Sequence, residues 1–553
     1  MKTAKSLLPI LSLGIAELTV NAAQLQCTTD AFAKYLASDS SRGEPAVVQW
    51  AYRIPKGGTF QVPDSDIAYP ESPTDLPELC VLQVNVTSST ESSYTFGLFL
   101  PSEWNERFLA VGNGGFAGGI YWADMGVGVR YGFASMSTDT GHNSISTDGS
   151  WAYNSPEKVT DWGYRAMHGS VVLAKELANA YYGKRAGYSY YSGCSTGGRQ
   201  GLKEVEMYPE DFDGVIAGAP AWWTAHLQPW TVKIGTYNRP GANGNQIPES
   251  LFSWIEAQII EQCDPQDGLK DTVISSPQQC ELNLEALLCQ GPKTSGSANC
   301  LDPAQLETLY NIYSDYVDTN QTFVFPHLLP GSESQWSVLV NNGSNNPLGY
   351  EYVQYYLGLG PQWSPDQFDY SIVQLADKLD PGNATARNFD LSPFQNSGGK
   401  LLMYHGMADG FIPTDSSRYF YNQVAKTLAP SGIDLDNFYR FFYIPGMQHC
   451  AGTPDSMHAP WYIAGPNQAS SLSSELHSVP GFSDAQHDIL LALVDWVEKG
   501  VAPDFLIATT WKNDTTQAEV YRQRPLCAYP KMAFYKGQGD PDQAKNWECR
   551  SLY

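Results

Sequence analysis

Residues 188–207 read YSYYSGCSTGGRQGLKEVEM. The aromatic run at 188–191 favours a β-strand, and residues 201–207 suit a helix. Between them, GCSTG at 193–197 matches G-x-S-x-G, whose glycines allow a tight strand-to-helix turn that exposes the central hydroxyl in a strained conformation. The pattern predicts that Ser195 is a nucleophile. The motif alone would also fit an ordinary glycine-rich turn, so its surroundings decide.

A serine hydroxyl needs partners to become a nucleophile. It reacts when a histidine takes its proton and a carboxylate holds and stabilises the imidazole. Asp409 follows the apolar run 401–404, and His449 follows the run 439–444. A single histidine is more often structural, but the order Ser195, Asp409, His449 is the one found in α/β-hydrolases. We therefore predict that these three residues form the catalytic triad.

Apolar or aromatic runs that end in glycine-rich turns recur along the chain and alternate with helical patterns. The clearest helix is expected at residues 484–499, with Gly500 as its stop. This alternation favours a mostly parallel sheet. The predicted fold class is α/β, an α/β-hydrolase fold with a large inserted lid domain.

The composition and the hydrophobic pattern of the sequence change in the middle of the chain. Between residues 224 and 390, four cysteines cluster, turn residues multiply and the strand-then-helix rhythm fades. An insertion between the nucleophile and the acid can cover an active site without disrupting the sheet. We expect a signal peptide at 1–22, a catalytic domain made of 23–223 and 391–553, and a lid at 224–390.

An early glycine-rich turn is a candidate for the oxyanion hole. GNGG at 112–115 follows an apolar run, where this fold supplies one backbone donor to the developing oxyanion. We predict that Gly114 or Gly115 donates from there and that the Thr196 N–H is the second donor. Taken by itself, the segment fits a flexible loop equally well.

The chain begins like an exported protein. Lys2 and Lys5 precede an apolar run at 7–16, and small residues close the segment near Ala22. That run is shorter than the roughly 20 residues needed to span a bilayer, and no second long one follows. We expect a secreted, extracellular protein without a membrane anchor. Sequons for N-glycosylation support this compartment: Asn85, Asn320, Asn342, Asn383 and Asn513.

Ten cysteines in an exported chain suggest five disulfides, although sequence alone does not fix their pairing. A bond between Cys194 and Cys450 would clamp the nucleophile and the base together across the insertion. A thiol nucleophile at Cys194 is the competing interpretation, but the central residue of the motif is Ser195 and exported cysteines tend to be oxidised. Spacing favours these pairs: Cys27 with Cys80, Cys194 with Cys450, Cys263 with Cys280, Cys289 with Cys300, and Cys527 with Cys549.

The charge of the chain excludes some partners. Its formal net charge is −25, which would repel the phosphates of nucleic acids and anionic lipid surfaces. We therefore expect no nucleic-acid partner and no membrane partner. Aromatic side chains are plentiful, and several near or within the lid are candidates for stacking on a phenolic ring, although such residues are more often core: Trp222, Trp223, Tyr352, Tyr355 and Tyr356.

An acidic loop in the insertion, residues 264–273, is a candidate metal site. Asp264, Asp267 and Asp271 offer hard oxygen ligands, which suit calcium better than zinc. The carbonyls of Leu269 and Val273 could complete the coordination shell. The spacing is not that of an EF-hand, and chemistry alone favours a solvated acidic turn.

Four longer motifs carry a resemblance to known proteins. They read GCSTGGRQG at 193–201, YPEDFDGVIAGAP at 208–220, GGKLLMYHG at 398–406 and PGMQHC at 445–450. Together they resemble the fungal tannase and feruloyl esterase family, and within it the feruloyl esterase B-like members. The motifs cover most of the chain after the expected signal peptide, and the lid is the part least covered.

The resemblance implies an ester hydrolase in which Ser195, Asp409 and His449 react and Cys194 is bonded to Cys450. It also implies that a structural calcium ion occupies the acidic loop, which reverses the preference for a solvated turn. No organic cofactor is expected.

The resemblance further implies phenolic substrates, either esters of plant cell-wall polysaccharides such as xylan or small aromatic esters. Feruloyl esterases release hydroxycinnamic acids such as ferulate, whereas tannases cleave galloyl esters, and TGGRQ at 196–200 is nearer the former. A catalytically silent protein that binds phenolics or carbohydrate is an alternative from another class, and the intact trio argues against it. A peptidase is a third possibility, which amide hydrolysis without ester hydrolysis would favour.

Overall fold

The structure of the chain is a computed structural model, and it describes residues 25–38, 43–239, 244–291, 299–340, 346–473 and 475–551. The expected signal peptide at 1–22 and the sequon at Asn342 lie outside these residues. Within the described part of the chain, no helix combines the length and the apolar character needed to cross a bilayer.

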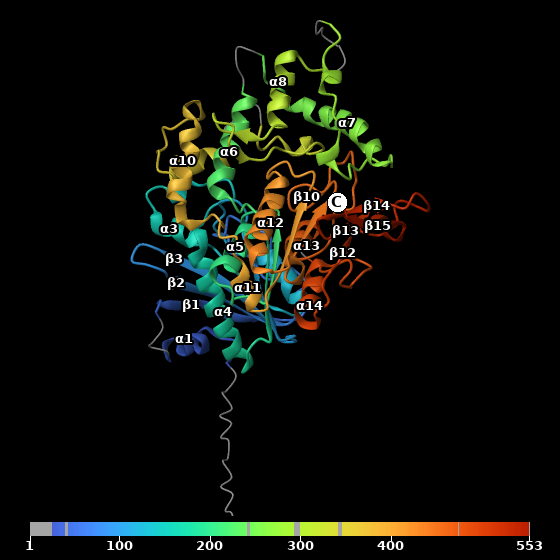
Figure 1. Cartoon of the computed structure of the whole chain (residues 1–553). Helices are drawn as coiled ribbons and strands as arrows, with labels where there is room; N and C mark the ends of the chain where they lie inside the picture. Colours follow the sequence, from blue (N-terminus) through green and yellow to red (C-terminus); the bar gives the residue numbers. More distant parts are fainter. Residues whose placement is uncertain are drawn as a thin grey trace, which may run out of the picture.

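A nine-stranded sheet forms the centre of the molecule, in the order β1-β2-β3-β5-β4-β6-β7-β10-β11 (Figure 1). From β5 to β11 in this order, neighbouring strands run parallel, whereas β1, β2, β3 and β5 pair antiparallel. The predicted α/β class with a mostly parallel sheet is confirmed. The strands are β1 (Ala46–Ile54), β2 (Leu79–Thr87), β3 (Ser93–Pro101), β4 (Arg107–Val111), β5 (Ala134–Thr138), β6 (Tyr188–Cys194), β7 (Gly214–Gly218), β10 (Lys400–Gly406) and β11 (Tyr439–Ile444).

Helices cover both faces of this sheet. Side chains alternate along β10, so that Leu401 and Met403 join one hydrophobic core while Leu402 and Tyr404 join the other. Burial on both faces explains why the parallel strands have nearly continuous apolar runs. The first core packs against α1 (Thr29–Ser38), α4 (Ala166–Tyr182), α5 (Thr196–Met207) and α12 (Asp415–Leu428), and the second against α2 (Trp122–Arg130) and α14 (Ile489–Lys499).

Helix α14 begins later than the periodic pattern at 484–499 predicted, because Asp488 is its N-cap. The Asp488 carboxylate accepts two backbone N–H bonds from the first turn, which fixes the start of the helix there. Gly500 ends the helix in a left-handed conformation, as predicted.

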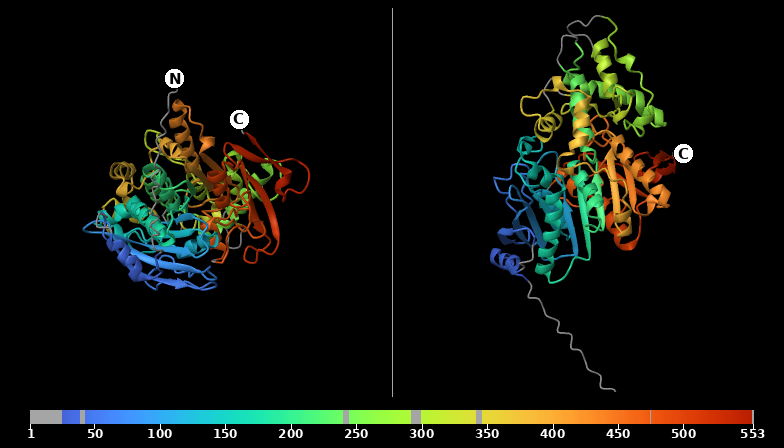
Figure 2. Two further views of the ribbon diagram at one scale, coloured as in Figure 1. Left: turned by 90° about the horizontal axis from the view of Figure 1, so that it is seen from below. Right: turned by 60° about the vertical axis from the view of Figure 1, so that its left-hand side comes forward.

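The described residues of the segment assigned to the lid, 224–390, lie at one end of the sheet in both side views (Figures 1 and 2). They surround a hydrophobic core of their own, which includes Trp336. The same core takes in Ile412 and Met457, which lie in loops after β10 and β11. The elements are α6 (Thr224–Tyr237), α7 (Phe252–Cys263), α8 (Pro303–Ile312), α9 (Pro347–Glu351), α10 (Tyr370–Leu379), β8 (Tyr316–Val317) and β9 (Phe323–Phe325).

The C-terminal part forms two antiparallel hairpins beside β11. A bridge between Phe442 and Ala528 connects them to the sheet. The structure pairs all ten cysteines in the combination that spacing favoured, including Cys194 with Cys450. The remaining elements are β12 (Phe505–Trp511), β13 (Val520–Cys527), β14 (Lys531–Tyr535), β15 (Trp547–Ser551), α3 (Pro156–Thr160), α11 (Ser392–Asn396) and α13 (Pro466–Leu472).

Candidate active site

Ser195 lies at a sharp turn between β6 and α5, as the G-x-S-x-G pattern predicted. Its backbone has φ 62° and ψ −122°, a region in which a residue with a side chain is strained. The Ser195 N–H donates to Gly218 O at 2.9 Å and anchors the turn to β7. A Cβ added to Gly193 would come within 2.7 Å of the Gly197 backbone, so the turn excludes a larger residue there.

Asp409 and His449 meet at the ends of adjacent strands. Asp409 follows β10 and His449 follows β11, and these strands pair in parallel. The His449 Nδ1 atom lies 2.7 Å from Asp409 Oδ2. A hydrogen bond donated by Nδ1–H leaves Nε2 unprotonated and able to accept a proton. This is the geometry that a general base and its orienting carboxylate require.

Asp409 is fully buried and accepts four hydrogen bonds. Oδ1 accepts from Phe411 N at 2.8 Å and from Ile412 N at 2.9 Å, while Oδ2 accepts from His449 and, at 3.0 Å, from His405 Nε2. Burial alone would raise the pKa of Asp409, but the charge of His449 and the hydrogen bonds from both histidines hold that pKa well below its usual range. Asp409 therefore stays ionised and can stabilise an imidazolium.

His405 is a site residue to which sequence reasoning gave no role. It is fully buried, and its Nδ1 atom lies 2.7 Å from Ser417 Oγ. A neutral ring that carries its proton on Nε2 satisfies both contacts, with the Ser417 hydroxyl donating to Nδ1 and Nε2–H donating to Asp409. In the sequence, its place at the end of an apolar run four residues before Asp409 was the available signal.

One cavity of about 430 Å³ is lined by both Ser195 and His449. The disulfide between Cys194 and Cys450 lies in the same wall, with the two Cα atoms 5.9 Å apart. It connects the residue before Ser195 to the residue after His449. The structure therefore brings Ser195 and His449 to one cavity, and Asp409 is buried out of its wall and hydrogen-bonded to His449.

Apolar residues form part of the cavity wall. Val338 and Leu348 come from the lid, and Phe411 follows Asp409 in the loop after β10. The Phe411 ring centroid lies 5.2 Å from that of His449. An aromatic ring bound beside the triad would contact these side chains.

Polar groups of Tyr69, Tyr121, Asp124 and Asn467 line the same cavity. The rings of Tyr69 and Tyr121 stack with their centroids 4.1 Å apart. Asp124 is 2% exposed, and its carboxylate accepts a hydrogen bond from the Ser470 hydroxyl. Burial raises the pKa of Asp124 to about 7, although the Ser470 bond opposes this rise. A buried carboxylate among tyrosine rings suits a hydroxylated aromatic ligand.

The predicted oxyanion donors are not equivalent. Gly114 N donates to the Tyr69 hydroxyl at 2.7 Å, so this N–H is already paired. Gly115 has φ 55°, and a Cβ there would come within 2.3 Å of Ser146 O. Thr196 begins α5, where the first N–H groups have no helical partner, and its hydroxyl donates to Gly115 O at 3.0 Å. Gly115 and Thr196 fit the role better than Gly114.

The aromatic residues considered for stacking lie outside the described cavity wall. Trp222 is 1% exposed, and its ring stacks on that of Trp223 with centroids 5.1 Å apart. Tyr352 and Tyr356 are buried in a cluster between the lid and the catalytic domain. Tyr355 packs edge-on against Tyr153. These contacts support the core interpretation for the buried Trp222, Tyr352 and Tyr356, whereas Trp223 and Tyr355 are partly buried and pack against the edge of a core.

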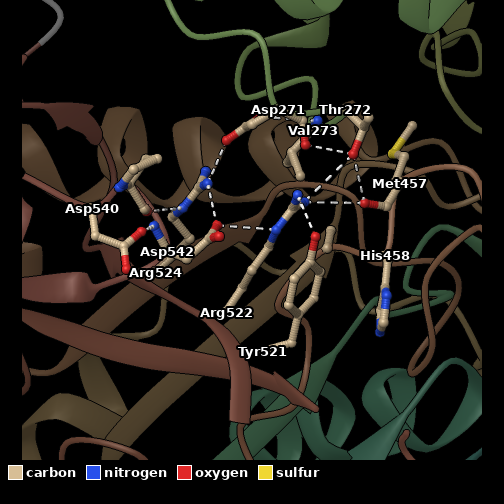
Figure 3. A network of polar contacts seen from close by, with 12 residues as sticks. Asp271, Thr272, Val273, Met457, His458, Tyr521, Arg522, Arg524, Asp540 and Asp542 are labelled. Carbon is tan, nitrogen blue, oxygen red and sulfur yellow. Dashed lines mark hydrogen bonds and ion pairs between the residues drawn. The ribbon is translucent and has the colours of Figure 1, made fainter. Parts of the chain in front are cut away.

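The acidic loop at 264–273 holds carboxylate side chains close to one another. Asp271 N donates to Asp264 Oδ1 at 2.9 Å. Burial, and in addition the charge of Asp271, raises the pKa of Asp264, so a bound cation would relieve an unfavourable environment. Asp271 also pairs with Arg524 of β13 (Figure 3), and both side chains are 7% exposed. The donor set of Asp264, Asp267 and Asp271 fits a hard cation such as calcium.

Leu269 and Val273, the predicted carbonyl ligands, lie in the same loop. Their backbone N–H groups donate to the carboxylates of Asp267 at 2.9 Å and of Asp271 at 3.1 Å. The Thr272 hydroxyl donates to Met457 O at 2.9 Å (Figure 3). The loop is thereby tied to the chain that follows His449.

The described sequons differ in accessibility. Asn320, Asn383 and Asn513 are exposed. Asn85 lies in β2, and its amide nitrogen donates to Tyr94 O at 3.3 Å and to Thr95 Oγ1 at 3.1 Å. These contacts disfavour a glycan at Asn85.

A mostly parallel sheet that presents a strained serine, together with a histidine and a buried carboxylate, defines the chain as an α/β-hydrolase. The sequence profile of the family described as "Tannase and feruloyl esterase" matches residues 80–346 and 360–550. The chain belongs to the tannase and feruloyl esterase family, and it is a carboxylic ester hydrolase. The resemblance that the four motifs carried is confirmed.

Relatives are similar along most of the chain. The Aspergillus oryzae protein named "Probable feruloyl esterase B-1" is 38% identical over 472 residues, covering 85% of this chain and 83% of that protein. The Aspergillus fumigatus protein named "Probable feruloyl esterase B-2" is 34% identical over 552 residues, covering 99% and 100%. The crystal structure of feruloyl esterase B from Aspergillus oryzae has a TM-score of 0.84 and 35% identity, covering 94% of this chain and 99% of that one.

Proposed function

We propose that this protein is a secreted serine esterase that releases hydroxycinnamic acids such as ferulate from plant cell-wall esters. The observation that carries the proposal is the 2.7 Å contact between Asp409 Oδ2 and His449 Nδ1, beside a cavity that His449 shares with Ser195. Relatives named feruloyl esterase B, similar over most of the chain, support the choice of acyl group.

The reaction begins when His449 Nε2 takes the proton of the Ser195 hydroxyl, whose oxygen attacks the ester carbonyl. Asp409 stabilises the imidazolium that forms. The backbone N–H groups of Gly115 and Thr196 stabilise the negative charge on the carbonyl oxygen. His449 then gives its proton to the leaving alcohol, and an acyl-enzyme remains on Ser195.

Water completes the reaction. His449 Nε2 takes a proton from a water molecule, the resulting hydroxide attacks the acyl-enzyme, and the proton returns to the Ser195 oxygen as the acid leaves. The disulfide between Cys194 and Cys450 keeps the nucleophile and the base in place through both steps. Because the nucleophile and the base are already held in place, less entropy is lost on reaching the transition state, and the activation free energy is lower.

The cavity suits a substrate with a hydroxylated aromatic ring. Val338, Leu348 and Phe411 offer apolar contact, while Asp124 offers a carboxylate that can accept a hydrogen bond from a phenolic hydroxyl. The same carboxylate could receive the neighbouring hydroxyls of a galloyl group, so a tannase that cleaves galloyl esters is the second candidate. Only the acyl preference separates the two.

Calcium is proposed as a structural ion in the acidic loop. Asp264, Asp267 and Asp271 would supply carboxylate oxygens, and Leu269 and Val273 would supply carbonyl oxygens. Bound there, the ion would neutralise clustered negative charge and brace the loop. It takes no part in the steps above.

Secretion is proposed from two features. The N-terminal segment has the pattern of a signal peptide, and the structure contains five disulfides, which persist in oxidising compartments. Exposed Asn320, Asn383 and Asn513 are the proposed glycan sites among the described residues.

The test is hydrolysis of methyl ferulate and methyl gallate, with acid release measured by chromatography, for the purified protein and for Ser195→Ala in parallel. Faster release of ferulate by the unmodified protein supports the feruloyl esterase, whereas faster release of gallate supports the tannase. Turnover of neither ester, or equal activity in Ser195→Ala, would overturn the proposal.

A further inference from the structure

One side-chain atom of the lid contacts both loops that carry the candidate acid and base. Gln335 ends the short helix η7 (Glu333–Gln335) of the lid. Its Oε1 accepts a hydrogen bond from Gly410 N at 3.0 Å and another from His449 N at 3.1 Å. Gly410 directly follows Asp409. A single amide oxygen therefore bridges the loop that carries the candidate acid and the loop that carries the candidate base.

The lid backbone around Gln335 lies directly against the loop that carries Asp409. A Cβ placed on Gly410 would come within 2.6 Å of the Gln335 Cβ and within 2.9 Å of Ser332 O. The glycine at 410 thus lets the lid backbone lie directly against the acid loop.

The segment that presents Gln335 is fixed in position. Trp336 and Ser332 are fully buried, and Trp336 Nε1 donates to Ser332 Oγ at 3.0 Å. Glu256 of α7 accepts from Ser334 N at 3.1 Å and from the Ser456 hydroxyl at 2.6 Å. Glu256 therefore joins the lid segment to the chain that follows His449. A side chain held by packing and hydrogen bonds loses little freedom when it binds its partners.

We propose that Gln335 is a positioning residue, which holds the acid and base loops in the register that the Asp409–His449 hydrogen bond requires. This inference rests on the proposed function, because it takes Asp409 and His449 as the catalytic pair. It also gives the lid a role beyond covering the cavity, since a lid residue completes the support of the triad.

The backbone N–H groups of Gly410 and His449 have the Gln335 oxygen as their acceptor and no other among the described residues. Without the Gln335 oxygen, the N–H groups of Gly410 and His449 lose their acceptor in a partly buried site, and the loops must shift to find another. A displacement of about 1 Å in a catalytic group can lower a rate about 100-fold. The distance between Asp409 and His449 would change first, because Gly410, next to Asp409, and His449 itself would both move.

The test compares three variants with the unmodified protein on methyl ferulate. Gln335→Met keeps the length of the side chain but removes the acceptor, and Gln335→Glu keeps an acceptor oxygen in the same place. Ser334→Ala is the matched control, because it removes the neighbouring lid contact to Gln448 Nε2 at 3.2 Å and leaves the bridge intact. Initial rates are measured below the unfolding temperature of every variant, and folding is checked by circular dichroism.

We expect Gln335→Met to lower kcat about 10- to 100-fold with KM within about twofold. Gln335→Glu should recover most of kcat, and its added charge should shift the acidic limb of the pH profile upward by stabilising the His449 imidazolium. Ser334→Ala should match the unmodified protein. Unchanged kcat in Gln335→Met, a loss confined to KM, or an equal loss in Ser334→Ala would overturn the inference. Failure of the unmodified protein to hydrolyse the ester would instead overturn the proposed function.

Discussion

Removing the disulfide between Cys194 and Cys450 tests whether it holds the nucleophile and the base together. The two cysteines are 256 residues apart in the sequence. In the chain-entropy model, a loop of this length restrains the unfolded chain by about 5.5 kcal/mol. Replacing both cysteines by alanine should therefore lower the free energy of unfolding by about that amount. It should also lower kcat, because Ser195 and His449 lose the link between their neighbours.

The double variant of Cys289 and Cys300 is the matched control. Those cysteines are 11 residues apart and join two lid residues outside the described cavity wall. The same model gives about 3 kcal/mol for this loop, and kcat should not change. The assay is urea unfolding followed by tryptophan fluorescence, with initial rates on methyl ferulate under folding conditions. Equal losses of stability in the two variants, or an unchanged kcat without the Cys194–Cys450 bond, would refute the reasoning.

Three further predictions concern Asp409, Asp124 and the acidic loop. Asp409→Asn should lower kcat about 10⁴-fold with little change in KM, measured as initial rates, because the amide favours the wrong tautomer of His449; a loss below tenfold would contradict the role of Asp409. Asp124 has a pKa near 7 in the folded chain against about 4 when unfolded, so the folded state loses stability as pH rises between these values. Asp124→Asn should remove this loss, so that the free energy of unfolding, measured in urea, rises by about 4 kcal/mol at pH 8 but changes little at pH 4. A rise that is the same at both pH values would count against the raised pKa of Asp124. Chelating calcium should lower the unfolding temperature, and added calcium should restore it, whereas in Asp267→Asn, which weakens the site, both effects should be smaller.

Much of the architecture was readable from local sequence. The turn at Ser195 is predictable because Gly193 and Gly197 permit a tight strand-to-helix turn that larger residues would hinder. The parallel strands are predictable because burial on both faces gives them apolar runs. The alternation of apolar runs with helical patterns indicates the fold, and the order Ser195, Asp409, His449 predicts the triad. Patterns of this kind act over a few residues, or depend only on order along the chain.

Features that depend on long-range contacts were not predictable in this way. His405 and Gln335 gained their roles from partners that folding brings to them, and no local pattern marks a glutamine whose oxygen bridges Gly410 and His449. Gly114 fits the predicted oxyanion role less well than Gly115, because its N–H donates to the hydroxyl of Tyr69, 45 residues away. Such contacts become visible only when the elements are placed in space.

The central claim is that Ser195 is the nucleophile and that His449 activates it. The most direct measurement is intact-protein mass spectrometry after reaction with a fluorophosphonate, followed by peptide mapping, for the unmodified protein and for Ser195→Ala and His449→Ala. We predict one adduct per chain on Ser195, no adduct in Ser195→Ala, and strongly slowed labelling in His449→Ala. An adduct on another residue, or equal labelling of Ser195→Ala, would contradict the claim.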